Sequence, residues 1–328
     1  MTHRFDYPIE QQDAGMTVER FLLSHGYSRH LIIDLKKTPA GLTVGGLHVY
    51  VTHRLTEGET LSVELPSDVP SETVVPTAME LALVYEDEHL LVVNKAAGTP
   101  IHPSQGSFSN TLANGLAWYF LQKGEPFVCR VINRLDRDTT GLLILAKHAL
   151  SACILSDMVQ KREIHRTYLA AVCGDMRKLF AAEGMTADAG CMAAQTTAPY
   201  GLSITDAAAY SGVVTAPIAR VDGSTIERQA DLQRGEYACT HFTVLSYHQA
   251  TDTSLVRLRL ETGRTHQIRV HMKHLGFPLP GDFLYNPDYR LIRRQSLHSW
   301  RLEFVHPITK EPLSFTAAVP DDMSVFLD

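Results

Sequence analysis

Two polar segments, each adjoining an apolar run, contain the residues of this chain whose types and spacing could do chemistry. The first, residues 131–141, holds Asp136 among charged neighbours and directly precedes the apolar run 142–146. The second, residues 261–269, follows an apolar stretch that ends at Leu260. A carboxylate beside a buried strand could project from a rigid element into a cleft, as catalytic sites require. A capped turn with a surface ion pair would account equally well for either segment taken alone.

Other chemical signatures are missing from the sequence. It has no G-x-S-x-G elbow, no P-loop and no H-E-x-x-H motif. His266, His271 and His274 lie close together, but their spacing matches no standard set of metal ligands. Histidines beside arginines more often contact phosphates or backbone carbonyls. The five cysteines are scattered without a C-x-x-C pair, which favours reduced thiols over a disulfide framework or a structural zinc site.

The composition is typical of a globular protein, with 328 residues, 45% hydrophobic and 20% charged. The chain lacks both an apolar run of roughly 18 residues and an apolar N-terminal stretch, so we expect a cytoplasmic protein without a membrane span. The net charge of −6 argues against a nucleic-acid partner. Residues 257–310, however, carry ten Lys and Arg against four acidic residues. This basic stretch is either a solvated surface or a nucleic-acid surface, and charge alone does not distinguish the two.

The hydrophobic pattern predicts two units joined by a linker rich in Pro, Ser and Thr, at residues 67–79. In the first unit, residues 1–66, we expect two short helices and a small sheet with a hairpin turn at Gly45 and Gly46. These elements are predicted at residues 18–22, 31–35, 42–44, 48–51 and 60–65.

The second unit, residues 80–328, mixes strands and helices without strict alternation, which indicates an α+β fold and not a doubly wound one. Strands are predicted at residues 81–85, 90–94, 142–146, 167–172, 240–246, 254–260 and 302–305, and helices at 112–122 and 151–163. Residues 177–211 are rich in Ala, Gly, Ser and Thr, and we interpret them as an insertion or mobile loop.

Together, the two polar segments resemble motifs of the RluA/RluD-type pseudouridine synthases. That family carries H-R-L-D-x-x-T-S-G and G-R-T-H-Q-I-R-x-H; this chain has N-R-L-D-R-D-T-T-G at residues 133–141 and the second motif unbroken at 263–271. Residues 94–103 look like the family's N-K-P-x-G-x-x-x-H-P segment, and residues 166–168 like its K-x-Y element. The ordered motifs extend the resemblance over roughly residues 80–320.

This resemblance implies a mixed, largely antiparallel sheet with flanking helices and an isomerase that converts uridine in structured RNA to pseudouridine. It implies no cofactor, and we expect a monomer. Ribosomal RNA is the first expected partner and transfer RNA the second. The N-terminal unit is similar to the S-four-like RNA-binding module, and the basic stretch would serve as a phosphate track.

The resemblance also assigns roles to residues. Asp136 would be the catalytic carboxylate, Tyr168 would stack under the uracil and could transfer a proton at C5, and Arg264 would form the ion pair with Asp136. Arg134 would fill the gap left by the flipped-out base. The other expected substrate-binding residues are Lys95, His102, Asn133, Leu135, Thr140, His266, Gln267, Ile268, Arg269, Leu297 and His298.

The chain departs from the family pattern at a few positions. Asn133 replaces the family's histidine, Thr140 its serine, Ala96 its proline and Arg166 its lysine. Whether Asp136 attacks the sugar, attacks the base or removes a proton stays open. Two other classes stay open as well: a non-catalytic RNA-binding protein of the same fold, and a glycoside hydrolase, for which Asp136 lacks an obvious acid/base partner.

Overall fold

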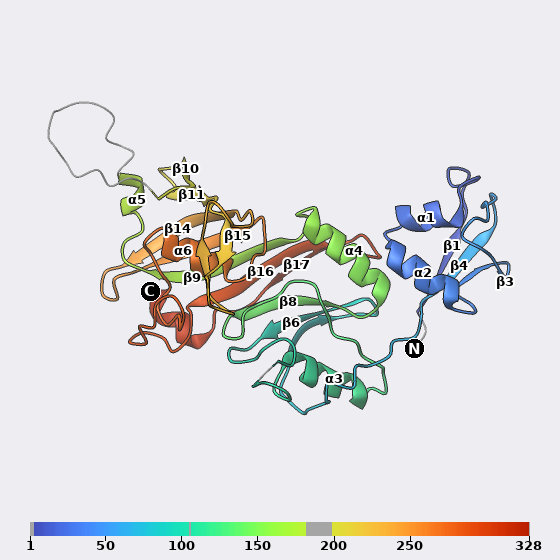
Figure 1. The fold of residues 1–328 in the computed structure, drawn as a ribbon, viewed down its shortest axis with the longest axis horizontal. Helices are drawn as coiled ribbons and strands as arrows, with labels where there is room; N and C mark the ends of the chain where they lie inside the picture. Colours follow the sequence, from blue (N-terminus) through green and yellow to red (C-terminus); the bar gives the residue numbers. More distant parts are fainter. Residues whose placement is uncertain (1–2, 105, 182–198, 328) are drawn as a thin grey trace.

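The computed structural model describes residues 3–104, 106–181 and 199–327 (Figure 1). The chain forms a small N-terminal unit at one end of an elongated molecule and a larger unit built on one long sheet. Within these described ranges, no helix has the length and apolar character that a membrane crossing needs.

The N-terminal unit packs two helices against a four-stranded antiparallel sheet of order β1-β4-β2-β3. Its elements are β1 (Arg4–Pro8), α1 (Val18–Ser24), α2 (Arg29–Lys37), β2 (Leu42–Val44), β3 (Leu47–His48) and β4 (Thr60–Glu64). Hydroxyl side chains cap both helices: Thr17 accepts from the Arg20 N–H and Ser28 from the Leu31 N–H. The two predicted helices and the glycine turn are therefore confirmed.

Two details of this unit differ from the sequence prediction. Strand β1 was not expected, and the strand predicted at 48–51 ends at His48. It ends there because the chain turns, with the Tyr50 carbonyl accepting a hydrogen bond from the His53 N–H.

The larger unit is an eleven-stranded sheet of order β10-β11-β14-β15-β9-β16-β8-β6-β5, with β17 beside β16 and β7 beside β8. Its strands are β5 (Ala82–Glu86), β6 (Leu90–Lys95), β7 (Arg130–Val131), β8 (Thr140–Ala146), β9 (His165–Cys173), β10 (Leu202–Asp206), β11 (Ser211–Val214), β14 (Thr240–His248), β15 (Thr253–Leu260), β16 (Leu297–Val305) and β17 (Pro312–Thr316). Strands β8 and β16 are parallel, and the other described pairs of this sheet are antiparallel. The predicted α+β class with a largely antiparallel sheet is confirmed.

Alternation along β8 sends its side chains to two different cores, as expected for a strand that is buried on both faces. Leu143 and Leu145 join the core that contains α3 (Leu112–Gln122) and α6 (Gln267–His274). Leu142 and Ile144 join the core that contains α4 (Ala149–Gln160). The motif that carries Asp136 therefore precedes a strand that is held from both sides.

The remaining short elements are the helix α5 (Lys178–Ala181), a hairpin of β12 (Ile218–Arg220) and β13 (Arg228–Ala230), and a 3-10 helix at Asp321–Phe326. Of the two alternatives for residues 177–211, a mobile loop is wrong for the described C-terminal part, and an insertion stays a prediction. Residues 202–206 form β10, which pairs with β11 at the edge of the large sheet because its polar side chains suit an exposed edge. Residues 182–198 of that prediction lie outside the described residues.

Candidate active site

The loop that carries Asp136 is fastened to the strand that follows it. Asn133, which is buried, accepts a hydrogen bond from the Ile144 N–H at 2.8 Å and donates one to the Leu142 carbonyl at 3.3 Å. Gly141 then has a φ of +108°, and a Cβ there would lie 2.2 Å from the Ser299 carbonyl oxygen. Only glycine permits this approach of β8 to β16. The position of Asp136 is thus set by backbone contacts on both sides of it.

Asp136 is held by an arginine from the second motif. Arg269 Nη1 lies 2.8 Å from Asp136 Oδ2, and the same guanidinium donates two hydrogen bonds of 2.7 Å to the carboxylate of Asp282. The side chain of Arg269 is 1% exposed and that of Asp136 27%. Burial opposes the charge on Arg269, but the hydrogen bonds and negative charges of the two carboxylates outweigh burial and raise the pKa of Arg269. Asp136 therefore faces solvent beside a permanent buried cation.

His266 lies on the other side of Asp136. It has a φ of +58° at the start of α6, a left-handed conformation that is uncommon for a residue other than glycine. Its Nδ1 is 2.9 Å from the Tyr285 hydroxyl, and its Nε2 is 3.9 Å from Asp136 Oδ2. Burial lowers the pKa of His266, against the opposing effect of the Asp136 charge, so the ring is neutral at neutral pH.

An apolar floor lies under these charged groups. Asp136 opens into a hollow of about 60 Å³ whose apolar lining consists of Leu135, Tyr168, Leu260, Ile268 and Leu297. Burial raises the pKa of Tyr168, and the charge of Asp136 adds to this effect against that of Arg166. Tyr168 is therefore a neutral phenol at neutral pH. We call this space the Asp136 hollow.

The structure brings most of the expected residues to the Asp136 hollow. In addition to Asp136, Tyr168 and the apolar residues, it is lined by Arg134, Arg264, His266, Gln267 and Arg269. The expected ion pair between Arg264 and Asp136 is wrong. Arg264 instead contacts Glu236 and the Tyr237 carbonyl, because it precedes α6 while Arg269 lies inside that helix and points back under the loop.

Four of the expected substrate-binding residues are buried behind the hollow and do not line it: Lys95, Asn133, Thr140 and His298. Lys95 Nζ donates to the carbonyls of Ala96, Thr99 and Arg137, and burial lowers its pKa to about 7. Thr140 Oγ1 lies 2.8 Å from His298 Nδ1. These four residues are corrected from substrate contact to support of the loop, since they are buried and each forms at least one hydrogen bond within the protein. His102 is exposed but does not line the hollow.

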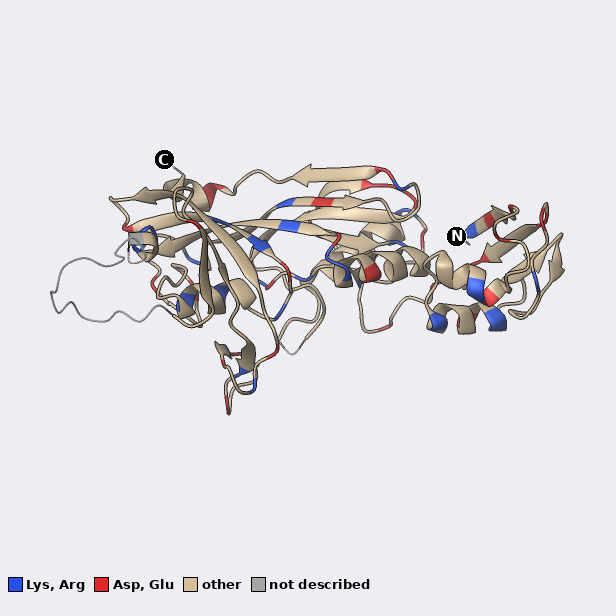
Figure 2. Ribbon diagram, turned by 90° about the horizontal axis from the view of Figure 1, so that it is seen from above, with Lys and Arg blue, Asp and Glu red and all other residues tan. Residues whose placement is uncertain are grey.

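Sequence reasoning missed Asp282, which is fully buried and fixes Arg269. A signal existed, because Asp282 is one of only four acids in the basic stretch and follows Gly281 in a turn. Two cations of that stretch are not available to the expected phosphate track, which otherwise stays a prediction. Lys and Arg are dispersed over the molecule (Figure 2), and Arg269 and Arg294 are buried in ion pairs with Asp282 and Asp322.

One group of side chains has the types and spacing to hold a metal. Ligand atoms of Cys239, His241 and Glu261 lie within 4.8 Å of one another. The Glu261 carboxylate, however, already contacts His241 at 2.5 Å and forms an ion pair with Arg162. A guanidinium beside a carboxylate opposes the binding of a cation there. We assign no metal to this group.

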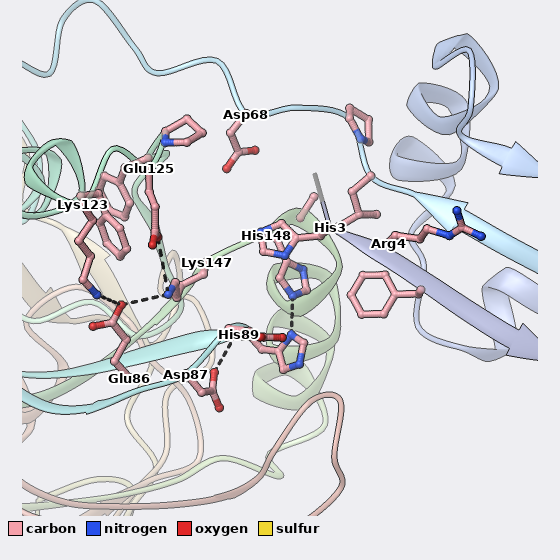
Figure 3. A pocket seen from close by; sticks show the side chains of 18 residues that line it. His3, Arg4, Asp68, Glu86, Asp87, His89, Lys123, Glu125, Lys147 and His148 are labelled. Atoms are coloured by element: carbon pink, nitrogen blue, oxygen red, sulfur yellow. Dashed lines mark hydrogen bonds and ion pairs between the residues drawn. The ribbon is translucent and has the colours of Figure 1, made fainter. Parts of the chain in front are cut away.

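A larger cavity, of about 820 Å³, lies between the two units (Figure 3). Several of its charged side chains pair within the cavity: Glu86 contacts Lys123 at 2.8 Å and Lys147 at 3.0 Å. His89 Nδ1 lies 3.0 Å from His148 Nε2. Because these groups satisfy one another, the cavity has the character of an interface between units, distinct from the Asp136 hollow.

Comparisons with known proteins identify the family of this chain. Residues 89–274 match the family model described as RNA pseudouridylate synthase. The chain is 38% identical over 94% of its length to the RNA pseudouridine synthase YjbO of Bacillus subtilis, covering 97% of that protein. It is 34% identical over 82% of its length to the ribosomal large subunit pseudouridine synthase D of Nitrosomonas europaea, covering 71% of it.

A solved human structure, RNA pseudouridylate synthase domain containing 1, shares the fold. It has a TM-score of 0.54 and 24% identity, covering 80% of this chain and 89% of that one. The family model and these relatives place the chain among the RNA-modifying isomerases. The chain belongs to the RNA pseudouridylate synthase family and forms pseudouridine from uridine in RNA.

Proposed function

We propose that this protein isomerises uridine in structured ribosomal RNA, with Asp136 as the catalytic carboxylate. One observation carries the assignment of Asp136: the carboxylate is solvent-accessible, lies above an apolar floor, and contacts an arginine that Asp282 holds in place. The support for ribosomal RNA comes from relatives named ribosomal large subunit pseudouridine synthase D. Transfer RNA is the second substrate to test.

The reaction requires the N1–C1′ bond to break, the C5–C1′ bond to form, a proton to leave C5 and a proton to bind N1. A carboxylate can attack the electron-deficient centre or take the proton, provided that it stays ionised. Arg269 orients the carboxylate of Asp136 by direct contact at 2.8 Å. Asp136 would therefore be held in one position for the reaction.

Tyr168 would have a different role from the proton transfer that the family resemblance allows. A neutral phenol cannot accept the proton that leaves C5, and burial keeps Tyr168 neutral at neutral pH. Its ring would instead form the apolar surface over which the detached uracil turns. Asp136, or the neutral His266 ring beside it, would be left as the acceptor of the C5 proton.

A basic hollow next to the site supports an RNA substrate. It has a volume of about 440 Å³ and is lined by Arg220, Arg228, Arg234 and Arg264. Arg220 and Arg228 form no ion pair with any residue in the described ranges. Arginines without acidic partners suit phosphate groups on the strand that enters the Asp136 hollow. Exposed Arg134, at the mouth of the hollow, would fill the gap left by the flipped-out base.

The experiment uses unmodified ribosomal RNA and unmodified transfer RNA as separate substrates for the purified protein. Pseudouridine positions are mapped in each after incubation, with RNA treated by an Asp136→Asn protein as the control. Defined sites in ribosomal RNA that depend on Asp136 would support the proposal. Defined sites in transfer RNA alone would overturn the ribosomal assignment but keep the role of Asp136.

A further inference from the structure

A further hollow opens beside the loop of Asp136 and is separate from both the Asp136 hollow and the arginine-lined hollow. It has a volume of about 350 Å³ and lies between Arg137 on one side and the segment 281–295 on the other. Two aromatic side chains line it, Phe283 and Tyr289, which are 44% and 39% exposed. Exposed aromatic rings that gather in one hollow indicate a binding surface more than scattered ones do.

The turn that carries Phe283 is tied to the catalytic carboxylate. Asp282, immediately before it, binds Arg269 and also accepts hydrogen bonds from the Leu284 and Tyr285 N–H groups at 3.1 and 3.2 Å. The centre of the Phe283 ring lies 5.5 Å from the Arg269 guanidinium carbon. Phe283 is therefore placed by the same buried ion pair that places Asp136.

The turn is also rigid on its other side. Gly281 has a φ of +74°, and a Cβ there would lie 2.1 Å from the Arg294 carbonyl oxygen. Arg294 is buried and binds Asp322 through two hydrogen bonds of 2.7 Å. A ring presented on a preorganised turn loses little entropy when a partner stacks on it.

The charges of this hollow favour one ligand class. Arg137 pairs with Asp138 and Arg294 with Asp322, so both cations are neutralised locally. Arg293 is exposed and forms no ion pair within the part of the chain that the structure describes. One unneutralised guanidinium beside two exposed rings matches a nucleotide, whose base has a π-face and whose phosphate is anionic.

We propose that this hollow binds the unpaired nucleotide next to the target uridine. Its base stacks on Phe283 and Tyr289, and its phosphate contacts Arg293. The inference rests on the proposed function, because an RNA strand must enter the Asp136 hollow for its neighbour to reach this one. The enzyme then selects uridines whose neighbour can leave its own stack, without reading which base that neighbour is.

Binding to a short hairpin RNA tests the proposal. The loop of the hairpin carries one uridine flanked by adenines, and two further versions carry an abasic nucleotide on the 5′ or the 3′ side of that uridine. Dissociation constants are measured for the wild type, for Phe283→Leu with Tyr289→Ala, and for the control Trp118→Ala. Trp118 is a similarly exposed aromatic residue, at 37%, on α3.

Removing the neighbouring base that stacks in this hollow, on the 5′ or the 3′ side, should raise the Kd of the wild type and of Trp118→Ala by about 5- to 150-fold. This is the effect of removing one or more stacking interactions. The same base removal should change the Kd of the double variant by less than about twofold, because its stacking surface is already gone. Arg293→Gln should lower the log–log salt slope of binding by about 0.7, as expected for one phosphate that is no longer bound.

Three results would overturn the proposal: no effect of either abasic nucleotide on the wild type, an equal effect on the double variant, or no binding of the hairpin. Phe283 contacts Arg269, so Tyr289→Ala alone is also measured. Tyr289→Ala should reduce the abasic effect, whereas Trp118→Ala should keep both this effect and the kcat on ribosomal RNA. Base-dependent binding without pseudouridine formation in any RNA would refute the proposed function and leave this subsite intact.

Discussion

Arg269 and Asp136 lie 133 positions apart in the sequence, yet Nη1 of the arginine is 2.8 Å from Oδ2 of the aspartate. The contact joins the two polar motifs and makes one site of them. Because Asp282 binds Nε and Nη2 of Arg269, the guanidinium is held in the orientation that brings Nη1 to Asp136. The buried guanidinium thereby holds the more exposed of its two carboxylates, that of Asp136, at the surface of an apolar hollow.

The first prediction concerns Asp136 itself. Asp136→Asn keeps the shape of the side chain but removes its charge, so pseudouridine formation should fall below about one thousandth of the wild-type rate. RNA affinity should stay within a few-fold, because the variant removes no group that binds phosphate. Asp157→Asn, an exposed carboxylate on α4, is the matched control. Turnover of Asp136→Asn within tenfold of wild type would show that Asp136 is not the catalytic carboxylate.

The second prediction separates Arg269 from Arg264. Arg269→Lys keeps the positive charge but cannot bind Asp136 and Asp282 together, so kcat should fall by about 100-fold with little change in KM. Arg264→Lys should mainly raise KM, since Arg264 contacts Glu236 and lines the arginine-rich hollow. Steady-state kcat and KM, measured for both variants over a range of RNA concentrations, check this difference. A larger loss of kcat in Arg264→Lys than in Arg269→Lys would instead support the ion pair between Arg264 and Asp136 that the family resemblance implied.

The third prediction concerns Asn133, whose side chain holds the backbone of β8. Asn133→Ala leaves the Ile144 N–H and the Leu142 carbonyl without the side-chain partner, which should cost about 1–3 kcal/mol of unfolding free energy. Asn133→His, the family residue, offers one donor and one acceptor in its neutral form and should cost less. Urea unfolding measures both.

The kinetics of these variants provide the control. Both folded proteins should retain their KM for RNA, and Asn133→His should show no new ionisation in its rate between about pH 5 and 8, because the residue meets backbone and not substrate. A loss of one RNA target with unchanged stability would show that Asn133 contacts RNA after all.

The sequence predicted the elements of the fold well where periodicity is strong. The helix expected at 112–122 is α3 with those bounds, and the apolar run 142–146 lies within β8. The edge strand β10 was missed although Leu202 and Ile204 alternate with exposed polar residues, because only two apolar residues carry the alternation. So short a pattern does not stand out in a segment rich in Ala, Gly, Ser and Thr.

The position of the candidate catalytic carboxylate was predictable, but its partner was not. Both Arg264 and Arg269 belong to the second motif, and the choice between them depends on the start of α6 after the left-handed His266. Likewise, Lys95 and Asn133 were expected to face the substrate because they are polar and belong to motifs. Their burial follows from tertiary packing, where a polar side chain can be satisfied by backbone groups distant in sequence.

The fourth prediction tests the proposed RNA-binding role of the N-terminal unit. Arg29, Lys36 and Lys37 on α2 are exposed and form no ion pair with residues that the structure describes. Changing all three to Gln should lower the log–log salt slope of RNA binding by about 0.7–0.9 for each phosphate that these side chains neutralise, while kcat at saturating RNA is kept. Lys161→Gln, whose lysine pairs with Asp157, is the control. An unchanged slope would argue against this unit as an RNA-binding module.

The last prediction concerns pH and the interface between the two units. Burial, reinforced by His3, His89 and Arg130, lowers the pKa of His148 from its ordinary 6.5 to about 3. Above about pH 6.5 the residue is neutral in both folded and unfolded chains and costs nothing. As the pH falls from 6.5 towards 3, only the unfolded chain binds the proton, so stability is lost by about 2 kcal/mol at pH 5.

His148→Asn removes this titration and keeps a good N-cap for α4, where the His148 ring accepts a hydrogen bond from the Ser151 N–H at 3.2 Å. Urea unfolding at about pH 7.5 and pH 5 should therefore show a loss that is smaller by about 2 kcal/mol in the variant than in the wild type. His30→Asn, an exposed histidine on α2, should leave the wild-type loss unchanged. Equal losses in all three proteins would mean that His148 is protonated in the folded chain, and that the contact between its ring and His89 opens without unfolding.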